Sequence, residues 1–558
     1  MVSGSLVRRL SVLMALCLAG PLLGCGGDDS SKLSVNLYGW HDDGTPDGAF
    51  VQGLPDYPGA ELMRVRVTRP STREVLTEQT VPLSDRRIAM DSIPLGQDLR
   101  MDFEVRSATG TIAGGSTPLF SFGSTSRYRA FRAMISPVNE FAPVGSMVRV
   151  TGTGEDRLVP SRLDRRELAA DWIGRVGHTA TPTEDGQVLI VGGGLVNAAP
   201  LPGSQPPLTE VFDDIQLFDP ATGYFTELAG DDAARQTGTV GADRLQTGRA
   251  YHSVTPLGGD RFLVVGGFRV AGGTSVATGT IELIDLNAAP GTRVQVLVDS
   301  SGSAMSLNSS RAMHSATRLE SGAVIVAGGR GGSSGQVLNS FEIIQTHPQN
   351  AHATQFPMST ARVGHAAVLL EDGESVWVLG GSNDDVLQST EVLSSQGSAT
   401  ASDLDRPRLE PAVYLLGASG SFNALVVGGM TGVSGGATGT YAFGRPDSGF
   451  TSTGQLSEAR GGATLVELPQ SRRLLILGGL DSNGDFVRSA EVLTFQGLQA
   501  AMGLDGPFGT TRYERAGFAA ALTDTGRVLL VGGKAPGEAA RDDAEFYNPR
   551  DPVVPPRQ

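Results

Sequence analysis

The stretch that decides the fold is "RVGHTATPTEDGQVLIVGGG", residues 175–194, because nearly the same phrase returns six more times before the chain ends. Each copy starts with an arginine and runs for 17 to 20 positions to a Gly-Gly pair, whereas the spacing between copies varies. Length therefore varies in the connecting loops and not inside the phrase. The copies begin at Arg175, Arg249, Arg311, Arg362, Arg408, Arg460 and Arg515.

Each phrase predicts a β-hairpin. Its turn carries Asp-Gly or a similar pair, as in "TEDGQV", which matches the twist of two flanking antiparallel strands. The second strand is continuously apolar, as in "VLIV", and this is typical of a strand buried on both faces. Glycines then end the strand where a side chain would obstruct a left-handed turn or a neighbouring backbone. The pairs are Gly192 and Gly193, Gly266 and Gly267, Gly328 and Gly329, Gly380 and Gly381, Gly428 and Gly429, Gly478 and Gly479, and Gly532 and Gly533.

A third strand follows each pair, with copies such as "IELIDL" and "AEVLTF". Five copies carry a glutamate at equivalent places, while the first ("IQLFDPATGYF") and the fifth ("TYAFG") lack the acid. We expect the repeated arginines to pair with these glutamates or with backbone carbonyls; a ring that binds an anion is the alternative. The glutamates are Glu282, Glu342, Glu391, Glu491 and Glu545.

Four copies have a histidine three positions after the arginine: His178, His252, His314 and His365. A structural role, with one hydrogen bond inside each repeat, is the first interpretation. A shared metal site is the alternative, but ligands must converge within a little over 2 Å of one ion. Radially repeated positions do not converge in this way. We therefore predict no metal and no cofactor.

The arginine, the frequent histidine, the apolar strand ending in Gly-Gly and a third strand ending in "DP" or "NP" resemble kelch modules. The resemblance covers about 160–550, although Pro411, Ala463 and Phe518 replace the histidine in three copies. It implies an all-β fold, with a seven-bladed β-propeller over 145–550 whose four-stranded blades surround a central channel. The last copy ends too soon for a fourth strand. A strand from 145–172, such as "MVRVTG", is expected to complete it, leaving 551–558 as a tail.

The chain starts with two arginines, a short apolar run and small residues, the layout of a secretory signal. "LLGC", ending at Cys25, resembles the lipobox of bacterial lipoproteins. That resemblance implies a signal peptide over 1–24, a lipid on Cys25, a polar tether over 25–32 and an envelope location, with the outer membrane favoured. An ordinary cleaved signal is the alternative.

Residues 33–143 lack the phrase and carry short alternating runs such as "RVRVTR". In this run Val65 and Val67 alternate with Arg64 and Arg66, a period of two that predicts a strand with one buried face. We expect a small immunoglobulin-like β-sandwich here.

Charge and composition exclude several functions. A net charge of −15 without a concentrated basic stretch argues against nucleic acid binding. Only two cysteines are present, Cys17 within the leader and Cys25 at its end, so no disulfide is expected in the mature chain. "DSNGD" (481–485) and "HDDGTPDG" (41–48) suggest calcium, but neither continues as an EF-hand loop does, and both are interpreted as exposed turns.

The sequence favours a lipid-anchored binding or scaffold protein over an enzyme. The insertions at 195–214, 229–246 and 268–280 are the expected contact elements for a protein or glycan partner, because recognition is concentrated in loops on rigid scaffolds. Kelch-type propellers also form the core of galactose-oxidase-like enzymes and of a sialic acid mutarotase. The copper-radical oxidases need a cross-linked cysteine that this chain cannot offer. A mutarotase or epimerase remains the alternative.

Overall fold

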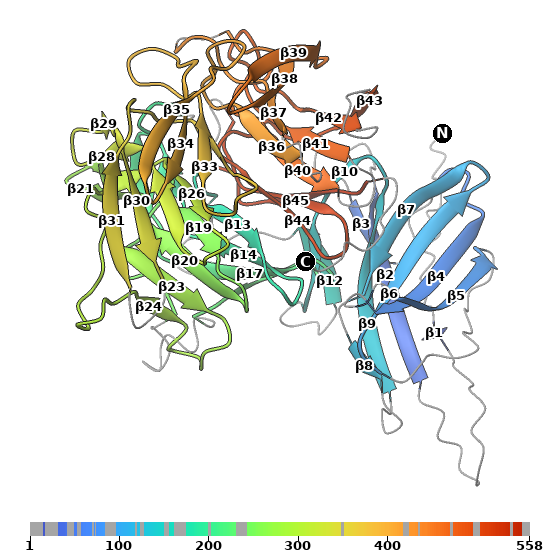
Figure 1. The fold of residues 1–558 in the computed structure, drawn as a ribbon. Coiled ribbons are helices and arrows are strands. Elements are labelled where there is room, and N and C mark those ends of the chain that lie inside the picture. The colour runs from blue at the N-terminus through green and yellow to red at the C-terminus, as the bar shows by residue number, and fades with distance from the viewer. Residues whose placement is uncertain are drawn as a thin grey trace, which may run out of the picture.

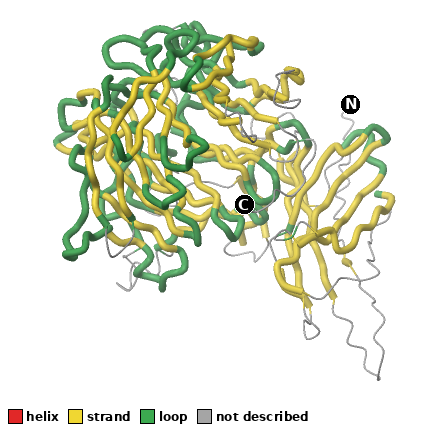
Figure 2. The backbone as a smooth tube through the Cα atoms, viewed as in Figure 1, coloured by secondary structure: helices red, strands yellow, loops and turns green. Residues whose placement is uncertain are grey.

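The computed structural model describes much of the chain, with gaps. The described residues are 15–16, 32–41, 49–52, 57–69, 72, 74–83, 96–117, 120–122, 128–149, 156–160, 174–198, 202–229, 243–346, 351–416, 423–433, 436–468, 473–494, 503–535 and 540–549. Across these ranges the chain is all-β, with strands, turns and loops and no helix (Figure 2). They accordingly contain no helix long and apolar enough to cross a membrane.

The N-terminal part forms one hydrogen-bonded network of nine strands, coloured blue to cyan in Figure 1. The path β1-β2-β9-β7-β6-β4-β5 has β3 attached to β2 and β8 attached to β6. Only two residue pairs join β7 to β9, so this junction divides the network into two halves. The strands are β1 (Ala15–Leu16), β2 (Lys32–His41), β3 (Ala49–Gln52), β4 (Leu62–Arg69), β5 (Glu74–Pro82), β6 (Gly96–Ser107), β7 (Gly110–Ser116), β8 (Phe120–Phe122) and β9 (Tyr128–Pro137).

A single apolar core fills the space between the two halves. Val35 of β2 and Ile135 of β9 pack in the same cluster as Phe103 of β6. The alternation predicted for "RVRVTR" is confirmed, since Val65 and Val67 are fully buried while the neighbouring arginines are half-buried. An immunoglobulin-like topology stays a prediction.

Most of the remaining described strands form seven four-stranded antiparallel sheets, one for each phrase, and the others form smaller sheets of two or three strands. In each of the seven, the phrase supplies the first two strands as the expected hairpin. In chain order the sheets are β13 (Thr179–Pro182), β14 (Val188–Val191), β17 (Ile215–Asp219) and β18 (Tyr224–Glu227); β19 (Ser253–Pro256), β20 (Arg261–Val265), β23 (Ile281–Asp285) and β24 (Val294–Val296); β26 (Ser315–Arg318), β27 (Val324–Ala327), β30 (Ser340–Gln345) and β31 (His352–Pro357); β32 (Ala366–Leu369), β33 (Val376–Leu379), β34 (Thr390–Ser394) and β35 (Gly397–Ala401); β36 (Ala412–Leu416), β37 (Asn423–Val427), β38 (Thr440–Arg445) and β39 (Gly449–Gln455); β40 (Thr464–Leu468), β41 (Arg473–Leu477), β42 (Ser489–Thr494) and β43 (Gly503–Thr510); and β44 (Ala519–Leu522), β45 (Val528–Val531), β46 (Ala544–Tyr547) and β10 (Phe141–Pro143).

Neighbouring sheets pack face to face through shared apolar clusters. The second strands are buried on both sides, as their continuous apolar runs predict; every residue of β14, β27, β33 and β45 is buried. One cluster joins the first sheet to the second, and similar clusters join each later pair. A further cluster, with Ile190 and Phe218 against Leu529 and Phe546, joins the seventh sheet to the first. First strands also contact in the same order, including β44 with β13.

The strand expected to complete the last sheet was placed wrongly. The fourth strand is β10. Met147–Arg149 of "MVRVTG" lie instead in β11 (Gly145–Arg149), which pairs with β12 (Asp156–Pro160), while 150–152 lie outside the described residues. The physical reason is packing: the Phe141 ring lies 5.1 Å from the ring of Tyr547, inside the core between the sixth and seventh sheets. The last strand of the seventh sheet therefore comes from the 33–143 segment.

Buried polar contacts tie the N-terminal network to the seventh sheet. Arg100 pairs with Asp102 at 2.9 Å and donates to the carbonyl oxygen of Asp524 at 2.9 Å. The Asn548 amide donates to the carbonyl oxygen of Ser136 at 3.0 Å. Because these groups are buried and paired, the two parts are held together by specific geometry.

Candidate functional site

The arginine of each phrase is buried and structural in its contacts. In all seven copies Nη1 donates to the carbonyl oxygen of the first glycine of the same pair, at 2.5 to 3.1 Å. In five copies the guanidinium also pairs with the third-strand glutamate; Arg311 Nη2 lies 2.8 Å from Glu342 Oε1. The same glutamate accepts the backbone N–H groups of Asn308 and Ser309, just before the phrase. The acid therefore fixes both the arginine and the chain leading to it.

The two copies without that glutamate recruit an acid from another position. Asp214, one residue before β17, holds Arg175 with both carboxylate oxygens at 2.9 and 2.7 Å. Asp405, three residues before Arg408, contacts that guanidinium at 2.9 and 3.0 Å. Every phrase thus keeps a buried ion pair. Comparing third strands alone could not find these two acids, because they occupy different positions.

The glycine pairs form close backbone contacts between copies. The first glycine of each pair has a φ of 57° to 65° and the second a φ of 90° to 103°, both in the region that favours glycine. A Cβ on Gly532 would lie 2.8 Å from the carbonyl oxygen of Arg175, in the first phrase. The N–H of Gly533 donates to that same oxygen at 2.9 Å, as Gly267 does to Arg311. The last copy therefore contacts the first as other copies contact their successors.

Two of the repeated histidines, His314 and His365, hydrogen-bond through Nε2 to the neighbouring sheet, whereas we expected one bond inside each repeat. Nε2 of His314 lies 2.9 Å from the Ser253 hydroxyl, and His365 lies 2.9 Å from Ser315. Both hydroxyls belong to the first strand of the preceding sheet. Burial lowers the pKa of His178, His314 and His365 to about 3, and nearby arginine charges add to the shift. The imidazoles are therefore neutral at pH 7.

The position two residues after each arginine was missed by the sequence analysis. All seven residues there adopt φ values of 50° to 72°. Four are glycine, but Tyr251, Met313 and Glu410 are not, and such conformations cost about 1–3 kcal/mol in non-glycine residues. Backbone bonds connect these positions, with Tyr251 donating to the Gly177 carbonyl at 2.7 Å and Gly177 to Gly517 at 3.1 Å. A sequence signal existed: three side chains replace glycine at one register of the phrase.

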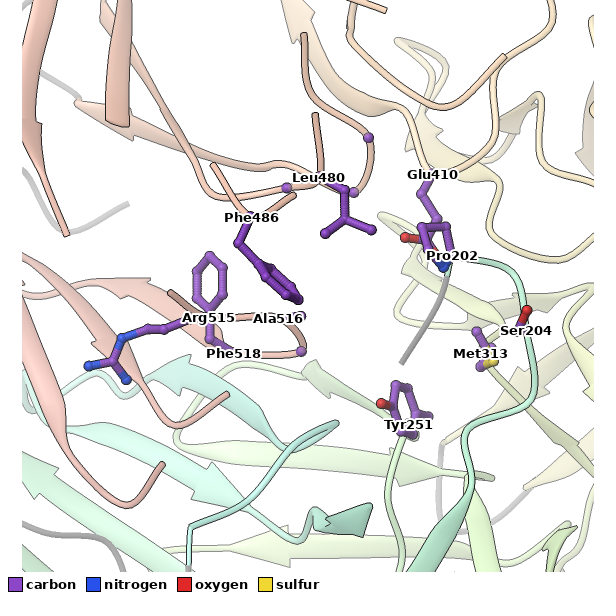
Figure 3. Close-up of a pocket in the computed structure, with 14 residues that line it drawn as sticks. Pro202, Ser204, Tyr251, Met313, Glu410, Leu480, Phe486, Arg515, Ala516 and Phe518 are labelled. Carbon is purple, nitrogen blue, oxygen red and sulfur yellow. The ribbon is translucent and has the colours of Figure 1, made fainter. Parts of the chain in front are cut away.

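These three side chains line a cavity of about 110 Å³ where the phrases begin (Figure 3). Backbone strain concentrates at functional sites, so this cavity is our candidate site. Its remaining wall comes from the first insertion, the sixth sheet's loop and the last phrase. The complete lining is Pro202, Ser204, Tyr251, Met313, Glu410, Gly461, Gly462, Gly479, Leu480, Phe486, Arg515, Ala516, Gly517 and Phe518.

Two titratable side chains face the cavity. The half-buried Glu410 accepts a hydrogen bond from the Gly203 N–H at 2.8 Å, and burial raises the pKa of its carboxyl. Burial and the negative charge of Glu410 both raise the pKa of Tyr251. The buried Tyr251 hydroxyl has no hydrogen-bond partner among the described residues. The Tyr251 side chain lies on the cavity wall in Figure 3, so this unused hydrogen-bonding group stands beside the space that a ligand would fill.

The first insertion packs against other copies. Arg330 holds the carbonyl oxygen of Gly203 at 2.9 and 2.6 Å, and the Gln205 amide donates to Ser275 at 2.7 Å. Loop 202–207 thus covers part of the cavity. The third insertion, 268–280, contains the hairpin β21 (Phe268–Ala271) and β22 (Thr274–Ala277). Residues 230–242 of the second insertion lie outside the described residues.

The other expected sites give no chemistry. "DSNGD" is a turn, exposed over 482–485, in which Asp481 accepts the N–H groups of Asn483 and Asp485, while 42–48 and Cys25 lie outside the described residues. Within the described ranges, no three His, Cys, Asp or Glu side chains gather as metal ligands. A scan against protein-family models gives no match, and a search of curated proteins finds no similar sequence.

Proposed function

We propose that the seven sheets form a seven-bladed kelch-type propeller and that the N-terminal network is a small sandwich beside it. The cluster and backbone bonds that join the last sheet to the first support closure. The nearly constant arginine-to-glycine spacing and the one buried ion pair per copy support the kelch resemblance.

On this scaffold we infer a binding function: a bacterial envelope protein, anchored by a lipid on Cys25, that recognises a protein or glycan partner at the end where the phrases begin. The observation that carries this inference is the cavity whose wall includes three left-handed non-glycine residues. A rigid ring of ion-paired phrases, with variable loops at one end, suits recognition better than conformational change.

The test compares two ends of the same molecule. A glycan array and an envelope-protein pull-down use the chain from residue 30, with 202–207 replaced by a Gly-Ser linker in one variant. The matched control replaces the hairpin turn 371–374, where the phrase reverses direction. We expect capture to be lost in the first variant only. Capture that survives it and is lost in the control would place recognition at the other end.

Anchoring has its own test. Cys25→Ala should release the protein from the membrane fraction and abolish labelling by a fatty-acid analogue. A variant that still pellets with membranes would contradict a lipid anchor.

A non-oxidative sugar-active enzyme, such as a mutarotase or epimerase, is the second candidate. The Glu410 carboxyl, whose pKa is raised by burial, is the candidate general acid or base for such chemistry, and the neutral Tyr251 hydroxyl is a candidate hydrogen-bond donor. Exchange spectroscopy on reducing sugars would detect accelerated anomer interconversion, and Glu410→Gln should abolish it. Unchanged exchange rates with the native chain would reject this candidate.

A further inference from the structure

The size of the cavity limits what it can hold. One water needs roughly 10–15 Å³ of such space, so the cavity of about 110 Å³ accommodates on the order of eight water-sized groups. A compact group of a few heavy atoms fits this space, whether free or at the end of a larger molecule.

The ionisable side chains that line the cavity favour a cation over an anion. Glu410 is the acid among its described lining residues, and Arg515 is the cation. The Arg515 guanidinium points away from the cavity in Figure 3 and is paired with Glu545 and Asp543. Arg330, which contacts the covering loop 202–207 from the third repeat, is held by the carbonyl oxygens of Gly203 and Gly335. A bound anion would therefore meet the Glu410 carboxylate without a free cation to offset it.

The remaining wall is aromatic and apolar. Phe486 projects toward the centre of the cavity from the sixth sheet's loop, and Tyr251 faces it from the second phrase (Figure 3). Phe518, Met313 and Leu480 complete the apolar surface. Aromatic faces attract cations by about 0.5–2 kcal/mol, most strongly where water is excluded, and rings arranged around a carboxylate suit a poorly hydrated cation.

We propose that this cavity binds a small organic cation, an alkylated or quaternary ammonium group, between the Glu410 carboxylate and the rings of Tyr251, Phe486 and Phe518. The proposal deepens the binding function above and rests on it for the recognition face. A sugar ring would need several hydrogen-bond partners, whereas the polar side chains directed at the space are few.

The test is calorimetric titration of the full-length protein in detergent with choline, tetramethylammonium, the uncharged isostere 3,3-dimethylbutan-1-ol, and glucose. We expect choline and tetramethylammonium to bind, and the uncharged isostere to bind about tenfold or more weakly. Equal affinity for choline and its isostere, or binding of glucose alone, would overturn the proposal.

Variants locate the charge and the rings. Glu410→Gln should weaken choline binding about tenfold or more, while Glu374→Gln, an exposed residue of a distant turn, should leave it unchanged. Tyr251→Phe keeps the ring and should retain affinity within about twofold, whereas Phe486→Ala should lose it. Unchanged melting temperatures for the glutamine variants separate lost binding from lost folding. If choline binds but no macromolecule is captured, only the proposed recognition of a macromolecule fails. If a macromolecule is captured but choline does not bind, only the proposed cation site fails.

Discussion

Exchanging the acid that holds Arg175 tests whether every phrase needs one buried carboxylate. Asp214 holds this guanidinium with two hydrogen bonds, and Gln216 occupies the register of the missing glutamate. Gln216 lies opposite Ile190, as Glu282 lies opposite Val264. Asp214→Ala removes both carboxylate contacts from a buried guanidinium. Breaking a buried pair in this way costs about 3–5 kcal/mol of unfolding free energy.

The effect of Gln216→Glu on stability should have opposite signs in the Asp214→Ala chain and in the native chain. In the Asp214→Ala chain, Gln216→Glu supplies a carboxylate where five other copies have one. Most of the lost unfolding free energy should therefore be recovered. In the native chain the same substitution places two acids together, since Gln216 Nε2 lies 3.1 Å from Asp214 Oδ2. That variant loses a hydrogen bond and gains repulsion, so it should be destabilised by about 1–3 kcal/mol.

Urea unfolding of the four chains, followed by near-ultraviolet circular dichroism, measures this coupling as a double-mutant cycle. Equal slopes are required for the midpoints to be compared. If Gln216→Glu destabilises the Asp214→Ala chain as much as it does the native chain, the register argument is refuted.

Three further results are expected. Because burial holds the pKa values of His178, His314 and His365 below the unfolded value of 6.5, the unfolded chain binds protons first. Stability should therefore fall as pH drops from about 6.5 toward 3, by about 1.4 kcal/mol per unit for each histidine. Urea midpoints at several pH values should show a smaller dependence on pH for His314→Gln than for the native chain. Gly532→Ala should lower the free energy of unfolding by about 2 kcal/mol or more, because the new Cβ meets the first phrase. Gly258→Ala, where the Cβ would have open space, should lower it by about 1 kcal/mol. Thermal melts of both variants would measure the difference. A chain starting at residue 139 keeps β10 and should resist proteolysis better than one starting at 145; equal resistance would argue against β10 as the completing strand.

The sequence was most informative where one physical requirement recurs. Continuous apolar runs, Asp-Gly turns and glycine pairs predicted the all-β class and the hairpins, because each constrains local backbone and burial together. The third-strand glutamates were found for the same reason. Asp214 and Asp405 were not, since a carboxylate can reach the same guanidinium from more than one backbone position.

The candidate site was less accessible from sequence. Tyr251, Met313 and Glu410 look unrelated in a linear reading, and only the shared left-handed backbone shows that they occupy one place. Their convergence with Phe486 depends on sheet packing. β10 was missed because a three-residue strand carries little pattern, and its pairing with β46 spans most of the chain.

The completion of the seventh sheet by β10 has a consequence for biosynthesis. Asn548 and Ser136, which bond beside this junction, are 412 positions apart. Closing a flexible segment of that length costs about 5 kcal/mol of chain entropy, and the contacts that offset it form only after the final copy has left the ribosome. A nascent chain that stops early leaves the Phe141 segment without β46 and the apolar face of the first sheet uncovered. Prematurely terminated products should therefore be degraded by cellular proteases, because only the full-length chain can bury these surfaces.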